Sequence, residues 1–286
     1  MRRFNVMGAC LGTLLITALL FSVQAPAAEQ EAAHTFVQLC DTQLGFGGYE
    51  EDKQRFRAAV DTINALKPDW VVICGDLVNI GSDDKAVADF REILKGFTIP
   101  CHLVSGNHDV GGVPTAASLA RYRKLQGKDY YAVDVPGFKL LVLNTQLWKA
   151  SVPEESARHD AWYRAELAKA KKTGVPVLLA SHYPPFLAEP GEKEIYYNLP
   201  LEARKSVLTA AAENGVRAWL AGHVHKNIIT QYEDIAIVAS ATTSKNFDGA
   251  PYGFRIWTVD SEGKLSHEYV ALDLPEELMK PKETKK

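Results

Sequence analysis

Short apolar runs alternate with longer amphipathic segments along the first half of the chain. The short runs, residues 35–40, 70–74 and 99–104, are strand candidates, and residues 70–74 form a β-branched run typical of a strand buried on both faces. Between them, residues 50–67 and 83–95 carry apolar side chains at helical spacing. This alternation predicts a parallel β-α-β arrangement. The carboxyl ends of parallel strands meet at one edge of a sheet, which is where α/β proteins usually bind ligands.

The rest of the chain continues this alternation and then turns to strands alone. Further helices are expected over residues 115–125, 154–172 and 201–213, and Ser82 is the expected N-cap of the second helix. Further strands are expected over residues 130–135, 139–144, 175–181, 216–221, 227–232, 235–239, 254–259 and 267–272. The first two of these meet at Pro136-Gly137 and predict a hairpin, and the last four read as mainly antiparallel. The predicted fold class is α/β: a four-layer α-β-β-α sandwich of two mixed sheets flanked by helices.

A polar motif follows each of five expected strands. The motifs are Asp41-Thr42-Gln43, Gly75-Asp76, Gly106-Asn107-His108-Asp109, His182 and Gly222-His223-Val224-His225. Each is weak alone, because a strand-end aspartate is more often a turn residue or cap and a single histidine is usually structural. As an ordered set they supply enough oxygen and imidazole ligands for two metal ions. The candidate ligands are Asp41, Gln43, Asp76, Asn107, His182, His223 and His225.

The Asn107-His108-Asp109 sequence predicts a division of labour, because three consecutive side chains cannot all face one metal. Asn107 is the expected ligand and His108 the expected proton donor. Asp109 is expected to fix the orientation of the His108 ring, since a carboxylate partner commonly sets a histidine tautomer. The alternative is a polar turn, for which all three residue types are suitable. With the other motifs, the set indicates a dinuclear metal hydrolase of phosphate esters.

The N-terminus has the features of an export signal. Arg2 and Arg3 precede a mostly apolar stretch, and Ala25-Pro26-Ala27 supplies small residues for cleavage. The alternative is a membrane anchor, but no stop-transfer pattern follows. We expect a signal peptide over residues 1–27, a phosphoesterase domain over residues 28–274, and a charged tail over residues 275–286. The protein is then exported, periplasmic or secreted, with no stable membrane anchor.

The charge of the mature chain argues against nucleic acid as a partner. The whole chain has 32 Lys and Arg against 35 Asp and Glu, and loss of Arg2 and Arg3 leaves 30 against 35. No basic run interrupts this mildly acidic composition. Cys40, Cys74 and Cys101 remain after cleavage, and we interpret them as buried structural thiols rather than metal ligands.

The motifs quoted above resemble those of the calcineurin-like metallophosphoesterase family. The family pattern is Asp-x-His, Gly-Asp, Gly-Asn-His-Asp/Glu, His and Gly-His-x-His, and the match covers the whole mature domain. The resemblance implies the four-layer sandwich and two ligand sets that share Asp76 as the bridge. The first set is Asp41, Gln43, Asp76 and His225, and the second is Asp76, Asn107, His182 and His223.

Gln43 departs from the family pattern, which has histidine at this place. An oxygen ligand in place of nitrogen favours harder ions. Two divalent metal ions are therefore expected, with Mn²⁺ first and Mg²⁺, Fe²⁺ or Zn²⁺ as alternatives. Asn79 occupies the place of the metal-binding tyrosine of purple acid phosphatases, which argues against a tyrosinate-bound ferric site. The implied mechanism is direct attack by a hydroxide bridging the metals, with His108 as general acid.

Two branches of the family share the Asp-x-Gln motif. The chain is more similar to the branch of calcineurin-like phosphoesterase domain-containing Ser/Thr phosphatases, which implies a phosphomonoester substrate, a small molecule or a phosphoprotein. The alternative is a nucleotide-diphosphate or phosphodiester hydrolase of the ADP-ribose diphosphatase type. A non-catalytic scaffold is a third reading, but it conflicts with the complete ligand set.

Loops are expected to form the substrate pocket. They are residues 111–116, 146–156 and 183–198. Four aromatic residues of the last loop could stack on a nucleotide base, but packing within the loop is the favoured interpretation. They are Tyr183, Phe186, Tyr196 and Tyr197.

Overall fold

The computed structural model describes Met1 and residues 34–279. The expected signal peptide, residues 1–27, lies outside the described residues except for Met1, and so does the end of the expected tail, residues 280–286. No helix within the described residues is long and apolar enough to span a membrane.

The first of two sheets has five strands in the order β11-β10-β1-β2-β3. β1, β2 and β3 run parallel, whereas β10 is antiparallel to both β1 and β11. The strands are β1 (His34–Leu39), β2 (Trp70–Ile73), β3 (Cys101–Leu103), β10 (Gly253–Val259) and β11 (Leu265–Ala271). The parallel arrangement of β1, β2 and β3 confirms the predicted β-α-β pattern, and β10 makes the sheet mixed, as the predicted fold class requires.

The second sheet has six strands in the order β4-β5-β6-β7-β9-β8. β5, β6, β7 and β9 are parallel, and β4 and β8 are antiparallel edge strands. The strands are β4 (Tyr131–Val135), β5 (Phe138–Val142), β6 (Val177–Ala180), β7 (Val216–Ala221), β8 (Ile228–Tyr232) and β9 (Ile235–Ala239). The expected hairpin at Pro136-Gly137 joins β4 to β5.

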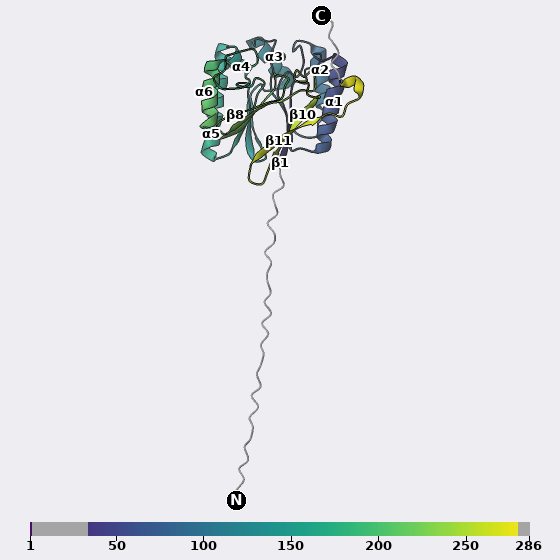
Figure 1. The fold of residues 1–286 in the computed structure, drawn as a ribbon. Helices are drawn as coiled ribbons and strands as arrows, with labels where there is room; N and C mark the ends of the chain where they lie inside the picture. The colour runs from purple at the N-terminus through teal and green to yellow at the C-terminus, as the bar shows by residue number, and fades with distance from the viewer. Residues whose placement is uncertain (2–33, 280–286) are drawn as a thin grey trace. The chain divides into compact units, whose positions relative to one another are not determined.

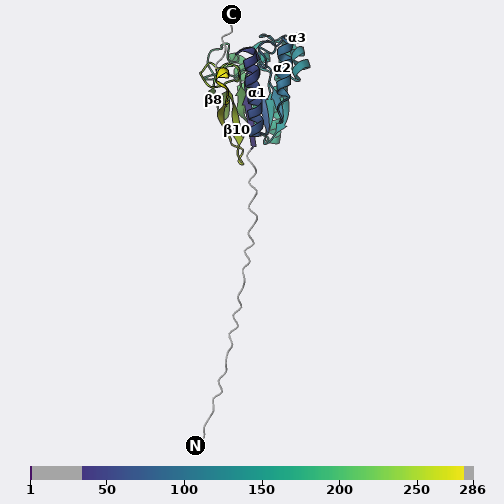
Figure 2. The same ribbon diagram turned by 90° about the vertical axis from the view of Figure 1, so that its right-hand side faces the viewer.

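Helices cover the outer face of each sheet. Figures 1 and 2 show α1 and α2 against one sheet, and Figure 1 shows α5 and α6 on the far side of the other. The helices are α1 (Tyr49–Leu66), α2 (Asp84–Leu94), α3 (Ala116–Gln126), α4 (Gln146–Lys149), α5 (Pro153–Thr173) and α6 (Leu201–Ala212). The predicted four-layer sandwich is confirmed.

The period of two along the buried strands produces these layers. In β1, Val37 and Leu39 point to the core beneath α1 and α2, whereas Phe36 points between the sheets. In β2, Val71 and Val72 divide in the same way. Side chains alternate across a strand, so a continuous apolar run can pack against a helix layer and a second sheet at once.

Two boundary predictions are wrong. The N-cap of α2 is Asp83, whose carboxylate accepts hydrogen bonds from the backbone N–H groups of Lys85 and Ala86. Asp83 caps more effectively than Ser82 because it makes both bonds at the positive end of the helix. The domain also continues past residue 274: Glu276–Leu278 form a 3-10 helix with Leu278 buried, and Arg55 donates to the Leu278 carbonyl.

Candidate metal centre

The five motifs meet at the carboxyl edges of the two sheets. Asp41 follows β1, Asp76 follows β2 and Asn107 follows β3. His182 and His223 follow β6 and β7 of the other sheet. Because both sheets end their parallel strands on the same side, the ligand candidates converge from two layers.

The side chains form two overlapping groups with Asp76 common to both. Asp76, His182 and His223 offer ligand atoms within 4.8 Å of one another, and so do Asp41, Asp76 and His225. A carboxylate has two oxygens and is suited to bridge two cations. The geometry thus places Asp76 where the family resemblance expects the bridging ligand.

Direct distances tie the two groups together. His182 Nε2 lies 3.3 Å from Asp76 Oδ2 and 3.0 Å from Asn107 Oδ1. His225 Nε2 lies 3.4 Å from Asp41 Oδ1. His223 Nδ1 lies 3.1 Å from His182 Nε2. These nitrogen and oxygen atoms lie close to one another, as the ligand atoms around bound cations do.

Gln43 supports an oxygen-rich metal site. Its backbone N–H donates to the Asp76 carbonyl at 2.8 Å, which anchors it beside the bridging candidate. Its Nε2 atom donates to Asn79 Oδ1 at 3.4 Å. The Oε1 atom is buried and has no hydrogen-bond partner. A buried unpaired oxygen is costly, and a cation would satisfy it.

Backbone strain is concentrated at the ligand candidates. Seven residues other than glycine in the described part of the chain have positive φ, and five of them are candidate ligands. They are Asp41, Gln43, Asp76, His223 and His225, with φ between 33° and 68°. Such conformations cost free energy and cluster at functional sites.

The motif glycines permit close approach between motifs. A Cβ atom on Gly106 would lie 2.1 Å from Asp76 Oδ1. A Cβ atom on Gly222 would lie 2.5 Å from Asp41 Oδ2. Each glycine therefore makes room for a carboxylate supplied by a different motif.

Backbone carbonyls orient three of the imidazoles. His182 Nδ1 lies 2.9 Å from the Cys74 carbonyl, and His225 Nδ1 lies 2.6 Å from the Lys245 carbonyl. His108 Nδ1 lies 2.7 Å from the Asn79 carbonyl. A carbonyl can only accept, so Nδ1 carries the hydrogen and Nε2 faces the site in each ring.

The expected role of Asp109 is wrong. Its carboxylate does not orient the His108 ring, which is held by Asn79. Instead, Asp109 accepts hydrogen bonds from the backbone N–H groups of Leu77, Val78 and Gly106 at 2.9, 3.3 and 2.7 Å. The Asp109 side chain is buried in the turn that follows β3. It ties the Asp76 motif to the Asn107 motif.

The electrostatics of the cluster favour a cation. Burial opposes ionisation of Asp76, but the nearby imidazoles, His182 foremost, hold the pKa of its carboxyl below the ordinary value. Burial likewise opposes a charge on His182, yet the carboxylates of Asp76 and Asp41 raise its pKa to about 10. A site that holds a proton this strongly also attracts metal ions, which compete for the same nitrogen.

Aromatic residues surround the cluster, and sequence reasoning only partly anticipated them. Tyr183 and Phe186 are buried, as the packing interpretation expects. Tyr196 and Tyr197 are 57% and 37% exposed, although their rings pack against each other with centroids 5.1 Å apart. Their ring centroids lie 4.8 and 5.6 Å from that of His223.

The sequence patterns did not predict that Phe46 and Phe247 contact the ring of His225. Their ring centroids lie 5.3 and 5.1 Å from it. Gly45 and Gly47, which flank Phe46, could have indicated its role. A large apolar side chain between two glycines is expected in a turn, outside the helices and strands that build the core.

The 183–198 loop is a fixed wall. Arg204 is buried and donates to the carbonyls of Pro190, Glu192 and Leu199. Lys149 donates to the carbonyls of Ile195 and Asn198 at 2.7 and 2.8 Å. These bonds satisfy the loop carbonyls from outside the loop and hold Tyr196 and Tyr197 in place.

Two of the three described cysteines are buried, as the sequence interpretation expects. Cys40 and Cys74 are buried and Cys101 is half-buried, and all three are free thiols. None belongs to the ligand groups found in the described part of the chain.

Comparison with known proteins gives one family. The calcineurin-like phosphoesterase family model matches residues 34–227. The chain is 33% identical over 262 residues to serine/threonine-protein phosphatase CPPED1 of Bos taurus, which covers 83% of each chain. It is 31% identical over 245 residues to the Homo sapiens protein of that name, which covers 82% of this chain and 78% of that one.

A solved structure shares the fold. The dimetal phosphatase of Danio rerio has a TM-score of 0.62 at 16% identity and covers 84% of this chain and 99% of that chain. The family uses a dinuclear divalent metal centre, and the clustered side chains described above fit one. The chain therefore belongs to the calcineurin-like phosphoesterase family and is a metal-dependent hydrolase of phosphoric esters.

Proposed function

We propose that this protein is a manganese-dependent phosphomonoesterase that removes phosphate from phosphoserine or phosphothreonine in proteins. The Bos taurus and Homo sapiens relatives, each more than 30% identical, are named serine/threonine-protein phosphatases. The observation that carries the monoester assignment is the pocket beside His108, whose volume is about 470 Å³.

The charges in this pocket favour a neutral leaving group. Arg121 is already paired: it donates to Asp84 Oδ1 at 2.6 Å and to the Gly81 carbonyl at 3.1 Å. The Asp109 carboxylate is occupied by backbone N–H groups. A diphosphate substrate would place a second phosphate here, where it would compete with Asp84 for the Arg121 guanidinium.

The metal ligands are proposed from the same cluster. Asp41, Gln43, Asp76 and His225 would hold one ion, and Asp76, Asn107, His182 and His223 the other. Gln43 and Asn107 add amide oxygens, which suit manganese better than softer ions. When bound, the two ions supply charge neutralisation for the phosphate and a water of lowered pKa.

His108 is the proposed proton donor. Its Nδ1 atom is fixed on the Asn79 carbonyl, which leaves Nε2 for the leaving oxygen. The ring is half-buried and lines the pocket, so a proton on Nε2 can reach a group bound there. A positioned acid of this kind typically contributes ~10²–10⁴ in rate.

A competition assay tests the proposed function. The mature, manganese-loaded protein receives a phosphoserine peptide and ADP-ribose together, and chromatography separates the products. Inorganic phosphate from the peptide is the expected result. AMP with ribose phosphate and no release from the peptide would reject the monoesterase assignment. The same chain stripped of metal and carrying Asp76→Ala is the control, because neither product should form.

We also propose that the protein acts outside the cytoplasm, in the periplasm or medium. The support is the Arg2-Arg3 start, the apolar stretch and the small residues at 25–27. N-terminal sequencing of protein from fractionated cells tests this, with a start at Ala28 in the exported fraction as the expected result. An intact start at Met1 in the cytoplasm would contradict it.

A further inference from the structure

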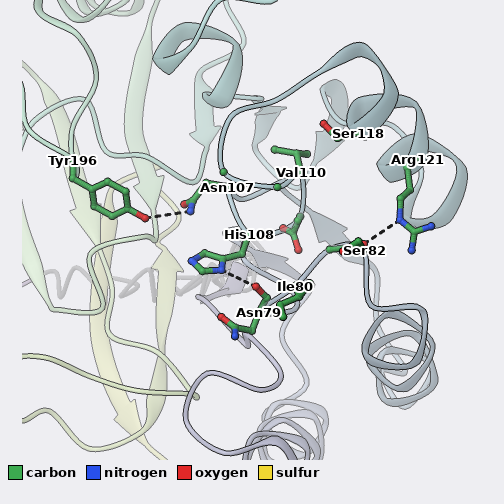
Figure 3. A pocket seen from close by; sticks show the side chains of 13 residues that line it. Asn79, Ile80, Ser82, Asn107, His108, Val110, Ser118, Arg121 and Tyr196 are labelled. Atoms are coloured by element: carbon green, nitrogen blue, oxygen red, sulfur yellow. Dashed lines mark hydrogen bonds between the residues drawn. The ribbon is translucent and has the colours of Figure 1, made fainter. Parts of the chain in front are cut away.

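A pocket adjoins the proposed proton donor, and its walls have a distinct chemistry. Figure 3 shows Tyr196 on one side of His108 and Ile80, Ser82 and Arg121 on the other. Its volume of about 470 Å³ lies within the ~300–1,000 Å³ of small-molecule sites. The pocket therefore has room for more than the hydroxyl-bearing side chain of a phosphorylated residue.

The walls near the mouth are apolar and open to solvent. Ile80 is 56% exposed and Tyr196 is 57% exposed, although both are large apolar or aromatic residues. Val110 and the backbone of Gly111 and Gly112 also line the pocket, and no atom within 4 Å would meet a Cβ added at either glycine. Exposed apolar walls beside a catalytic group mark a surface for a ligand.

The polar groups of the pocket are largely satisfied within the protein. Arg121 is paired with Asp84, and Ser118 completes a capping box with Thr115. An anionic ligand group entering the pocket would lose water and would compete with Asp84 for the Arg121 guanidinium. An apolar group would give up no hydrogen bonds to water on entering, and it would remove the apolar surfaces of Ile80 and Tyr196 from water.

We propose that this pocket is a specificity subsite that takes an uncharged, apolar residue next to the phosphorylated residue of a peptide substrate. The proposal rests on the proposed phosphoprotein phosphatase function. It assigns the leaving-group side of the substrate to the pocket, since His108 protonates the leaving oxygen at its entrance. Peptides with an apolar neighbour should bind more tightly than peptides with an acidic one.

Two phosphoserine peptides that differ only in the following residue, leucine or aspartate, test the proposal. The manganese-loaded wild-type protein should have a KM about tenfold lower for the leucine peptide, with a smaller difference in kcat. Ser82→Phe fills the pocket at a position that is exposed and forms no hydrogen bond within the described residues. It should raise the KM for the leucine peptide about tenfold and abolish the preference.

The matched control is Ser261→Phe. Ser261 is also exposed and follows β10, whose Val259 pairs with His34 at the start of β1, away from the site at its end. This variant should keep the wild-type preference. Ile80→Lys is a second test, because a cation on the apolar wall should turn the preference toward the aspartate peptide. Metal content and thermal unfolding confirm that each variant is folded.

The outcomes separate two failures. If both peptides release phosphate with equal KM, or if Ser82→Phe leaves the preference unchanged, the subsite is rejected and the phosphatase function stands. If neither peptide releases phosphate while ADP-ribose is cleaved, the proposed function fails and the subsite proposal fails with it.

Discussion

The Nδ1 atom of His108 lies 2.7 Å from the carbonyl oxygen of Asn79. The contact fixes the ring through a backbone group, which cannot be removed by changing the Asn79 side chain. It also connects two ends of the site, because the Asn79 side chain accepts a hydrogen bond from Gln43. One residue thus orients both the proposed acid and a proposed ligand.

Replacing the acid should affect substrates according to their leaving group. In His108→Ala, turnover of a phosphoserine peptide should fall by ~10²–10⁴, because a poor leaving alkoxide needs a proton. Turnover of nitrophenyl phosphate should fall far less. Steady-state kinetics with both substrates checks this, and metal content should stay at the wild-type value. An equal loss on both substrates would contradict the acid role.

Asp109→Asn should affect stability more than chemistry. The substitution replaces an oxygen that accepts from backbone N–H groups with a donor, so the free energy of unfolding should fall by about 1–3 kcal/mol. Denaturant unfolding measures this. The pH dependence of kcat should keep its wild-type shape, since Asp109 does not hold the His108 ring. A shift in the pH at which kcat falls, relative to the wild type, would show that Asp109 does orient the His108 ring.

Asp76→Ala should lose both metal ions, because Asp76 belongs to both ligand groups. Elemental analysis of the purified, manganese-loaded variant should find well below two equivalents. Asp69→Ala is the control: Asp69 lies beside His34 and the Thr35 N–H, at the other end of β1. Two full equivalents in Asp76→Ala would reject the bridging assignment.

Tyr196 should position Asn107. Its hydroxyl accepts a hydrogen bond from Asn107 Nδ2 at 3.3 Å, which leaves Asn107 Oδ1 facing His182. Tyr196→Phe should weaken binding of one of the two manganese ions about tenfold. Calorimetric metal titration measures the two affinities separately.

Tyr197→Phe is the matched control for Tyr196→Phe. Tyr197 also packs against His223, but its hydroxyl makes no hydrogen bond within the described residues. Equal effects of the two substitutions on metal affinity would show that ring packing, and not the hydrogen bond, supports the site.

His159 should make stability depend on pH. It is fully buried among aromatic rings, and burial lowers its pKa to about 4, from an ordinary value near 6.5. The folded state binds this proton less tightly than the unfolded state does. The contribution of His159 to the free energy of unfolding is therefore complete above pH 6.5 and is lost as the pH falls toward 4. The shift corresponds to roughly 3 kcal/mol.

His159→Gln removes this titration and keeps a group that can accept from the Asn144 N–H. The unfolding free energy of the metal-free wild type, relative to the variant, should fall between pH 6.5 and 4. Denaturant unfolding at several pH values measures it. Parallel pH curves for the two proteins would show that His159 does not cause the acid sensitivity.

The local sequence pattern was sufficient to predict the fold and to identify the motifs that converge at the site. A strand buried on both faces reads as a continuous apolar run, and the motif after it lies at the sheet edge wherever the strand is placed. Asp41, Asp76 and His182 could therefore be grouped before their distances were known. Strand and helix ends were less certain, as Ser82 and Asp83 show, because neighbouring polar residues can serve as the cap.

The sequence by itself determined the layer order, the family and which side chains meet at the sheet edges, since these follow from periodicity and from motifs at strand ends. Only the tertiary structure decided which partner each side chain takes. Asn79 rather than Asp109 holds His108, and Tyr196 faces the site while Tyr183 is buried. The physical reason is that hydrogen-bond partners and exposure depend on backbone direction and on residues far apart in the chain, which no local pattern records.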